Sequence, residues 1–293
     1  MKLAICITTR NRIIELEKCL DAIWSSSCYP HEVIVSDDSL DNQVISENIK
    51  ITQKYPGTVY VSGPKNGVCG NRNNAVAHAK DSDFVSFVDD DIYVEKDFVE
   101  RSTDFYQTLP EDERSKTIIS GISLDQNGDV MHPSKLSFRG YFQGELKHNH
   151  YETVVIHAAI FPISLFGDER WDENIFFGYE DGELCLRAIK RGYRIKKVAG
   201  LQVFNSCYEQ GTLTESSIAG LSNYQIYTEA ARLYVGVKRY KFIDPNFFNL
   251  LTFVSTYFIH LLFFLIKNKS LQVFPELMKR SKVDKLWKPL PQS

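Results

Sequence analysis

The stretch that decides the fold is Phe84-Val85-Ser86-Phe87-Val88-Asp89-Asp90-Asp91, an apolar run that leads directly into three consecutive aspartates. The apolar residues have the length and composition of a buried strand. Three adjacent carboxylates concentrate negative charge, which a hard divalent cation such as Mg²⁺ or Mn²⁺ commonly neutralises. A solvated turn before a helix that begins near Glu95 is the other interpretation. Their position at the end of a rigid strand favours a binding site.

Strands and helices alternate along the chain around this stretch. Apolar runs at residues 3–8, 32–36 and 58–62 indicate strands, and the spacing over 13–24, 43–54 and 71–80 predicts helices. This alternation predicts an α/β fold with a Rossmann-like, mostly parallel sheet flanked by helices. Ligands bind such sheets at the carboxyl ends of the strands. We therefore expect Thr9-Arg10, Asp37-Asp38 and the three aspartates to meet at one edge.

The second half of the chain has a less regular pattern. Between Gly121 and Tyr151, Gly, Pro, His and aromatic residues predict loops and short strands over the sheet edge. A strand over 153–157, a helix over 181–191 and a strand over 193–198 are predicted to follow. The composition changes near Leu221, so we expect a larger unit over residues 1–220 and a helical extension over 221–293.

The overall composition is that of a globular protein. The chain has 293 residues, of which 43% are hydrophobic and 24% charged, enough to bury one large core. A net charge of -3 argues against a nucleic-acid binder. The six cysteines show no C-x-x-C pair, which fits reduced thiols in the cytosol. The apolar stretch near the N-terminus is too short for a signal peptide, so we expect a cytoplasmic location.

Polar residues next to the first three strands are suited to a nucleotide. Asp37 and Asp38 can accept hydrogen bonds from a base or a ribose, although an Asx turn is the simpler interpretation of the pair. Arg10 and Arg72 offer positive charge, and each alone is typical of a solvated surface. The loop Asn66-Gly67-Val68-Cys69-Gly70 has backbone N–H groups that can approach a diphosphate closely.

A further acidic pair, Glu180-Asp181, stands at the start of the helix predicted over 181–191. The helix dipole stabilises carboxylates there, and N-capping is the simpler interpretation. The functional interpretation is a general base, because a hydroxyl is a poor nucleophile and a positioned carboxylate accelerates its attack by roughly 10²–10⁴. A pyrophosphate leaving group needs charge neutralisation, which a metal provides better than one side chain.

In their order and spacing these segments resemble glycosyltransferase family 2, whose members have the GT-A fold. The resemblance covers about residues 1–207, and no single motif carries it alone. It rests on Thr8-Thr9-Arg10-Asn11-Arg12, Val35-Ser36-Asp37-Asp38-Ser39, Asn66-Gly67 with Asn71-Arg72-Asn73, Phe87-Val88-Asp89-Asp90-Asp91, and Phe177-Gly178-Tyr179-Glu180-Asp181-Gly182-Glu183-Leu184-Cys185-Leu186-Arg187.

The resemblance implies a donor half over about residues 1–120 and an acceptor half over about 121–220. It implies inverting transfer from a UDP-, GDP- or dTDP-sugar to a hydroxyl on a glycan or a lipid-linked acceptor, with cell-surface polysaccharide synthesis as the setting. Asp89 and Asp91 fall on the DxD positions that bind metal, and Asp181, beside Glu180, falls on the general base. The residues expected to contact the donor are Thr8, Arg10, Asp37, Asp38, Asn66, Arg72, Asp89 and Asp90.

Two positions depart from the family's pattern. Many relatives have a histidine after the last core strand, where this chain has Asn205. An amide oxygen is a weaker ligand, so we expect modest metal affinity unless His157 or another group substitutes. For His157 an ordinary strand histidine is the simpler interpretation. Glu183 stands where relatives often have Asp, and it keeps the charge.

Residues 247–266 form an apolar run of about the length that crosses a bilayer, roughly 20 residues. Basic residues flank the run on both sides, which argues against spanning. We therefore expect a helix in the cytoplasmic leaflet, which makes the protein peripheral at the cytoplasmic face of the membrane. A helix packed on the larger unit, or on a second copy in a homo-oligomer, is the alternative. The flanking residues are Lys238, Arg239, Lys241, Lys267, Lys269, Lys279, Arg280, Lys282, Lys285 and Lys288.

Two other functions are compatible with an α/β sheet of this kind. A nucleotidyltransferase, which activates a sugar phosphate, resembles its relatives in a glycine-rich loop after the first strand, whereas Ile7-Thr8-Thr9-Arg10-Asn11-Arg12 contains no glycine. A catalytically inactive nucleotide-sugar-binding protein would have kept the fold without turnover. The presence of Asp89, Asp91 and Asp181 counts against this second alternative.

Overall fold

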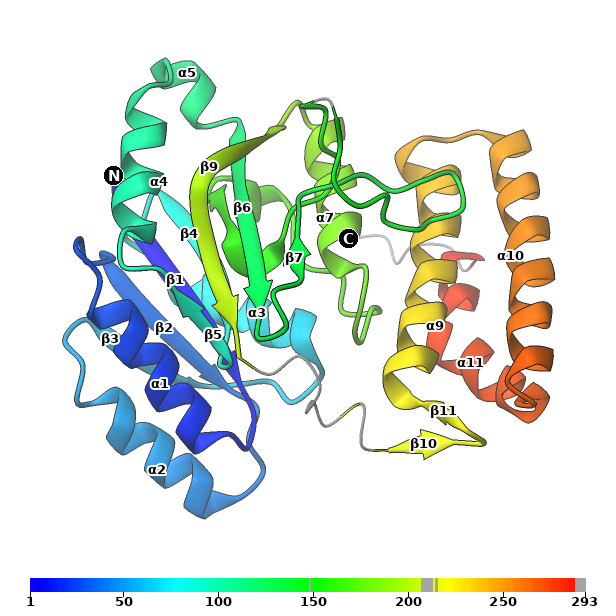
Figure 1. Cartoon of the computed structure of the whole chain (residues 1–293), viewed down its shortest axis with the longest axis horizontal. Coiled ribbons are helices and arrows are strands. Elements are labelled where there is room, and N and C mark those ends of the chain that lie inside the picture. The colour runs from blue at the N-terminus through cyan, green and yellow to red at the C-terminus, as the bar shows by residue number, and fades with distance from the viewer. Residues whose placement is uncertain (148, 207–212, 214–215, 288–293) are drawn as a thin grey trace.

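The computed structural model describes residues 1–147, 149–206, 213 and 216–287, and Figure 1 shows their arrangement. A mixed sheet with helices on both faces forms the larger unit, and a group of helices packs beside it. The elements of the larger unit are β1 (Leu3–Thr9), α1 (Ile13–Trp24), β2 (Glu32–Asp37), α2 (Asn42–Thr52), β3 (Thr58–Ser62), α3 (Val68–His78), β4 (Phe84–Asp89), β5 (Ile92–Val94), α4 (Phe98–Gln107), α5 (Glu111–Arg114), β6 (Thr117–Asp125), β7 (Val130–Met131), η1 (Ile156–Ala158), β8 (Ala159–Pro162), α6 (Leu165–Asp168), α7 (Glu180–Lys190) and β9 (Arg194–Asn205).

The sheet confirms the predicted fold class. Its strand order is β3-β2-β1-β4-β8-β6-β9-β5, with β7 paired to β6. The pairings β1–β2, β1–β4 and β2–β3 are parallel, as the strand–helix alternation predicts. Beyond β4 the sheet becomes mixed, because β8 runs antiparallel to both of its neighbours. The carboxyl ends of β1, β2 and β4 therefore lie side by side (Figure 1).

Alternation of side chains along each strand divides the core into two layers. On β1, Leu3, Ile5 and Ile7 pack against α1 and α4. The intervening Ala4 and Cys6 face the other layer, which contains α3, α7 and the C-terminal helices. The described cysteines are unpaired and four of the five are buried, whereas Cys207 lies outside the described residues.

Two sequence-based element predictions were wrong in the second half. Residues 153–157 do not form a strand: a single bridge joins Thr153 to Ser134, a 3₁₀ turn follows, and the strand is β8. The apolar run continues to Phe161, so composition did not fix the position of the strand. Gly121 does not end regular structure but lies inside β6, where a side chain would meet the carbonyl oxygen of Leu201 at 2.0 Å. Its lack of a side chain permits close approach of β6 and β9.

The C-terminal helices pack against α7 and against each other. They follow the short hairpin β10 (Ser217–Ile218) and β11 (Leu221–Ser222). The elements are α9 (Asn223–Lys238), a π-helical turn η2 (Arg239–Ile243), α10 (Phe247–Lys267), η3 (Leu271–Val273), α11 (Phe274–Ser281) and η4 (Val283–Trp287). A Ser222 capping box starts α9. The domain boundary near Leu221 stays a prediction.

Helix α10 has one buried stripe and one exposed apolar face. Phe253, Tyr257, Leu261 and Leu265, four residues apart, are buried against the other C-terminal helices. Phe247 and Phe248 are 72% and 77% exposed. Among the described residues this is the one helix whose length and composition would allow it to cross a membrane, and only 22% of its most apolar window is buried. Such a helix is weak evidence for a membrane by itself.

Candidate active site

The aspartates at the end of β4 contact the end of β1. Thr8 lies opposite Asp89 in the β1–β4 register, and its hydroxyl donates to Asp89 Oδ1 at 2.8 Å. Thr9 lies opposite Asp37 in the β1–β2 register and donates its hydroxyl to Asp90 Oδ2 at 2.7 Å. The strand registers therefore bring these polar groups together at one edge of the sheet, as the sequence predicts.

Arg12 forms ion pairs with two of the three aspartates, a role that the sequence did not indicate. One of its guanidinium nitrogens lies 2.7 Å from both Asp90 Oδ1 and Asp91 Oδ2. Both Asp90 oxygens thus have partners inside the protein, and burial raises the pKa of Asp90 to about 7 in spite of Arg12. Asp90 is therefore poorly placed to contact a donor, whereas Asp89 and Asp91 keep part of their carboxylates accessible.

Arg72 joins the two acidic groups that the sequence places 91 residues apart, from Asp89 to Glu180. It projects from α3, and its guanidinium lies 3.3 Å from Asp89 Oδ1 and 3.0 Å from Glu180 Oε1. The residue is only 3% exposed and lies over the Trp171 ring at 5.1 Å. It is therefore a buried charge and not a solvated one. Burial alone would raise the pKa of Asp89. The electrostatic effects of Arg72, and then of His157, outweigh burial, so the pKa of Asp89 is lowered.

The start of α7 brings the second acidic pair into this cluster. Tyr179 precedes it with φ of 63°, a left-handed conformation that costs energy for a side chain of this size. Glu180 Oε2 is buried and has no partner among the described residues. Burial, and then the negative charge of Glu180, raises the pKa of Asp181 to about 7. A carboxylate with such a pKa can accept a proton near neutral pH.

His157 belongs to the same cluster, although the sequence gave only weak reason to single it out. Burial lowers its pKa, against the charge of Asp89, so the ring is neutral near pH 7. Both ring nitrogens are buried without a hydrogen-bond partner in the described part of the chain. Unpaired buried polar atoms are costly in a folded protein, and three of them, the two His157 nitrogens and Glu180 Oε2, lie in this cluster.

At the end of β2, Asp37 is held by several hydrogen bonds, whereas Asp38 is more accessible. Asp37 accepts hydrogen bonds from the Ser39 backbone, Asn48 and Tyr60, at 2.7–3.0 Å. Asp38 accepts one, from the Lys65 backbone at 2.8 Å, and burial raises its pKa. Both oxygens of the first carboxylate are therefore used to fix the loop, while the second has capacity left for a ligand.

Glycines allow side chains to approach the backbone closely at this corner. A side chain at Gly63 would meet Asp38 Oδ1 at 2.1 Å, and one at Gly70 would meet Asn66 Oδ1 at 1.7 Å. Gly67 has φ of 106° and immediately precedes α3, whose first backbone N–H groups are available to an anion. Asn66 is exposed and donates to Glu173 at 2.8 Å, and Arg10 is exposed and close enough to act on the charge of Asp38.

The carboxylates at the end of β4 fit a divalent cation that shares its ligands with a substrate. Among the described residues no three His, Cys, Asp or Glu side chains form a cage for a metal. Mg²⁺ commonly uses one or two carboxylates together with substrate phosphates, and Asp89 and Asp91 can supply those. At the position of the missing family histidine, Asn205 pairs with Ile92 and Ser206 donates to the carbonyl of Asp91 at 2.9 Å.

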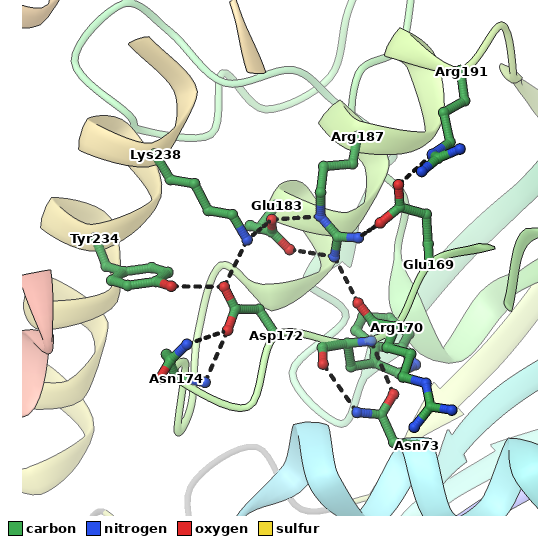
Figure 2. Close-up of polar contacts among 11 residues, drawn as sticks. Asn73, Glu169, Arg170, Asp172, Asn174, Glu183, Arg187, Arg191, Tyr234 and Lys238 are labelled. Carbon is green, nitrogen blue, oxygen red and sulfur yellow. Dashed lines mark hydrogen bonds and ion pairs between the residues drawn. The ribbon is translucent and has the colours of Figure 1, made fainter. Parts of the chain in front are cut away.

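One turn along α7, Glu183 belongs to a different kind of cluster, which Figure 2 shows. It is fully buried, and Arg187 and Lys238 each lie 2.6 Å from its Oε1. Lys238 also contacts Asp172 at 2.6 Å, as does the Tyr234 hydroxyl at 2.8 Å. Burial opposes ionisation of Asp172, but Lys238 outweighs it and lowers the pKa to about 2. This cluster joins α9 to the larger unit.

Comparison with known proteins gives consistent matches. The model of "Glycosyl transferase family 2" matches residues 4–164. A GalNAc(5)-diNAcBac-PP-undecaprenol beta-1,3-glucosyltransferase of Campylobacter jejuni is 34% identical over 92 residues, which cover 31% of this chain and 29% of that relative. The matched region is thus under a third of the relative's length.

Two solved structures illustrate the similarity in fold. S. aureus TarS 1-349 in complex with UDP-GlcNAc has a TM-score of 0.55 at 18% identity, covering 87% of this chain and 72% of that one. GalNAc-T7 with UDP, GalNAc and Mn²⁺ has a TM-score of 0.60 at 12% identity, covering 82% and 50% respectively. At these identities the likeness concerns the fold, and it agrees with the GT-A architecture.

Proposed function

The chain belongs to glycosyl transferase family 2 and is a glycosyltransferase, and we propose that it transfers a sugar with inversion from a nucleotide-diphosphate sugar to an acceptor hydroxyl. The observation that carries this proposal is the contact of Arg72 with both Asp89 and Glu180. The contact supports a single cleft in which donor-binding carboxylates face the carboxylate pair on α7. A catalytic base and a bound donor must share such a cleft for an in-line displacement.

We assign the proton transfer to Asp181. Its carboxylate takes the proton of the acceptor hydroxyl while the acceptor oxygen forms a bond to the anomeric carbon, and the bond from that carbon to the diphosphate oxygen breaks. The nucleoside diphosphate leaves with the electron pair. A pKa of about 7 suits a group that must accept a proton at neutral pH. Glu180, the preceding residue, is held by Arg72.

We assign donor binding to residues around the ends of β1, β2 and β4. Asp38 is the better candidate of its pair for the base or ribose, because Asp37 already holds three hydrogen bonds. Asp89 and Asp91 would hold Mn²⁺ or Mg²⁺, which when bound would neutralise the charge of the diphosphate. Thr8 and Arg72 keep the carboxylate of Asp89 in position. Arg10, Asn66 and the start of α3 complete the proposed pocket.

A donor screen tests this function. The protein is incubated with UDP-, GDP- and dTDP-sugars and Mn²⁺ or Mg²⁺, with glycans and lipid-linked saccharides as acceptors. Acceptor-dependent release of nucleoside diphosphate is the expected result. Release or consumption of pyrophosphate would instead identify a nucleotidyltransferase, which family membership disfavours, and binding without turnover would identify an inactive protein.

We further propose a lipid-linked acceptor, cell-surface polysaccharide synthesis, and attachment at the cytoplasmic face of the membrane. The Campylobacter jejuni relative carries a lipid-linked substrate in its name, and α10 presents an exposed apolar face with Lys267 and Lys269 at its end. Part of the predicted basic flank is used internally, since Lys238 contacts Glu183 and Arg239 contacts Glu152. Lys288 lies outside the described residues.

Substitution tests the attachment better than truncation, because α10 also contributes buried side chains to the C-terminal core. Phe247→Ser combined with Phe248→Ser and Phe263→Ser removes exposed rings only. We expect the variant to lose co-sedimentation with phosphatidylglycerol vesicles while keeping its melting temperature. Unchanged sedimentation would remove this face as the anchor, and a change in mass by light scattering would indicate a second copy as its partner.

A further inference from the structure

A hairpin over residues 135–143 presents aromatic rings next to the start of α7. Gln143 N–H donates to the Lys135 carbonyl at 3.1 Å and Ser137 N–H to the Tyr141 carbonyl at 2.8 Å, which closes the hairpin. Gly140, with φ of 79°, makes its turn. Three of its side chains, all aromatic, remain substantially exposed. These are Phe138, Tyr141 and Phe142.

The C-terminal helices hold this hairpin through its backbone. The Arg239 guanidinium donates to the Leu136 carbonyl at 3.2 Å, and the Tyr240 hydroxyl donates to the Phe138 carbonyl at 3.1 Å. Arg232 donates to a third carbonyl at 3.1 Å and lies over the Tyr141 ring at 4.2 Å. Figure 1 shows the loop after β7 reaching across to α9. Such anchoring rigidifies a loop whose rings face solvent.

One of these rings connects the hairpin to the proposed base. Phe142 stacks on Tyr179 with a centroid distance of 4.9 Å and an interplanar angle of 10°. Tyr179 immediately precedes Glu180 and Asp181 in the strained conformation described above. Phe142 is 43% exposed, so the ring is supported on one side by Tyr179 and open to a ligand elsewhere. Exposed aromatic groups of this kind mark binding surfaces.

On the basis of the proposed function, we infer that Phe142, supported by Tyr179 and held by the C-terminal helices, is the stacking platform for the sugar that accepts the transferred residue. The C–H groups of a pyranose form an apolar face that packs on a flat ring, while its hydroxyls remain free for Asp181. A ring stacked on the residue that precedes Glu180 and Asp181 fits the acceptor better than the donor, whose proposed pocket lies at the strand ends. Arg232 and Arg239 are positioning residues for this platform.

Saturation-transfer NMR with methyl β-glycosides of glucose, galactose, N-acetylglucosamine and N-acetylgalactosamine, with UDP and Mg²⁺ present, tests the inference. We expect at least one glycoside to bind the full chain, with its ring protons receiving the transfer. Phe142→Leu should reduce this signal at least fivefold, whereas Phe142→Trp should retain it, because leucine keeps apolar volume but not a flat face. Tyr29→Ala removes an exposed ring that lies tilted against Trp24, more than 100 positions earlier in the sequence, and should change nothing.

The outcomes separate this inference from the function on which it rests. The platform is supported if wild type and Phe142→Leu both show UDP signals and only the variant loses the glycoside signals. Binding of UDP without any glycoside, or equal glycoside binding by Phe142→Leu, overturns the platform and leaves the proposed function standing. Absence of binding of UDP, GDP and dTDP alike contradicts the function itself. Loss of vesicle binding by Phe142→Leu with unchanged glycoside signals would assign the ring to the membrane instead.

Discussion

Two clusters of buried charge meet on α7, and they differ in whether their partners are complete. Glu183 faces Arg187 and Lys238, and the network in Figure 2 gives its carboxylate a cation on each side. Glu180, three residues earlier, shares Arg72 with Asp89 and leaves one oxygen without a partner among the described residues. The first arrangement fastens two parts of the protein together. The second keeps polar capacity for something that binds.

The difference teaches how to separate a structural carboxylate from a chemical one in two neighbouring clusters. Complete pairing lowers the pKa of Asp172 to about 2, so that group stays charged and inert. Burial, and then the negative charge of Glu180, raises the pKa of Asp181 to about 7, so that group can exchange a proton at neutral pH. Perturbed pKa values in a shared cleft indicate function with more force than acidic residues alone.

The largest effect should come from Asp181→Asn. Loss of the base should reduce acceptor-dependent release of nucleoside diphosphate by roughly 10²–10⁴, without lowering the melting temperature, because a buried charge is replaced by a neutral amide. The measurement is kcat with the acceptor found in the donor screen, beside a melting curve. Normal turnover by this variant would show that another group is the base.

Glu183→Gln is the matched change one turn away. It should lower the stability of the protein and leave its turnover nearly unchanged. It leaves Arg187 and Lys238 with one carboxylate fewer in a buried site, at a cost of about 3 kcal/mol in the free energy of unfolding. Urea denaturation measures this cost, and kcat of the folded variant should stay within about threefold of wild type. A variant that was stable but inactive would contradict the assignment of a structural role to Glu183.

Asp172 makes a smaller, pH-dependent contribution to stability. Its pKa is lowered from 3.8 to about 2 in the folded protein, so it stabilises the fold at pH values above 3.8 and this contribution disappears as the pH falls towards 2. The contribution is roughly 2 kcal/mol. The difference in unfolding free energy between wild type and Asp172→Asn should therefore narrow over this range in urea titrations. A difference that was constant with pH would contradict the role of Lys238.

The smallest effect concerns the pH dependence of turnover. The base acts in its unprotonated form, so kcat should fall as the pH drops below about 7, the pKa of Asp181. In Glu180→Gln the neighbouring negative charge is absent, and the midpoint should move to lower pH by roughly one unit. A kcat profile for each protein shows this. If the midpoint stays in place, the charge of Glu180 does not act on the base.

Much of the fold could be predicted from the sequence because its signals are local. The strand Thr58–Ser62 has the predicted bounds, and α1 and β4 were placed within a residue, since apolar periodicity and length decide such elements. The acidic segments could be found because each lies at the end of a strong element. The strand β8 and the role of Gly121 could not be predicted, since pairing with distant strands decides them.

The sequence alone determined which residues carry charge, and the order along the chain of the strands at whose ends they lie. Only the tertiary structure decided which charges are paired: Arg12 with Asp90 and Asp91, Arg72 with Asp89 and Glu180, and Lys238 with Glu183. These partners are 17 to 108 positions apart, the extremes being Arg72 with Asp89 and Arg72 with Glu180. Pairing depends on distance in space and on burial, and the local pattern of a sequence specifies neither.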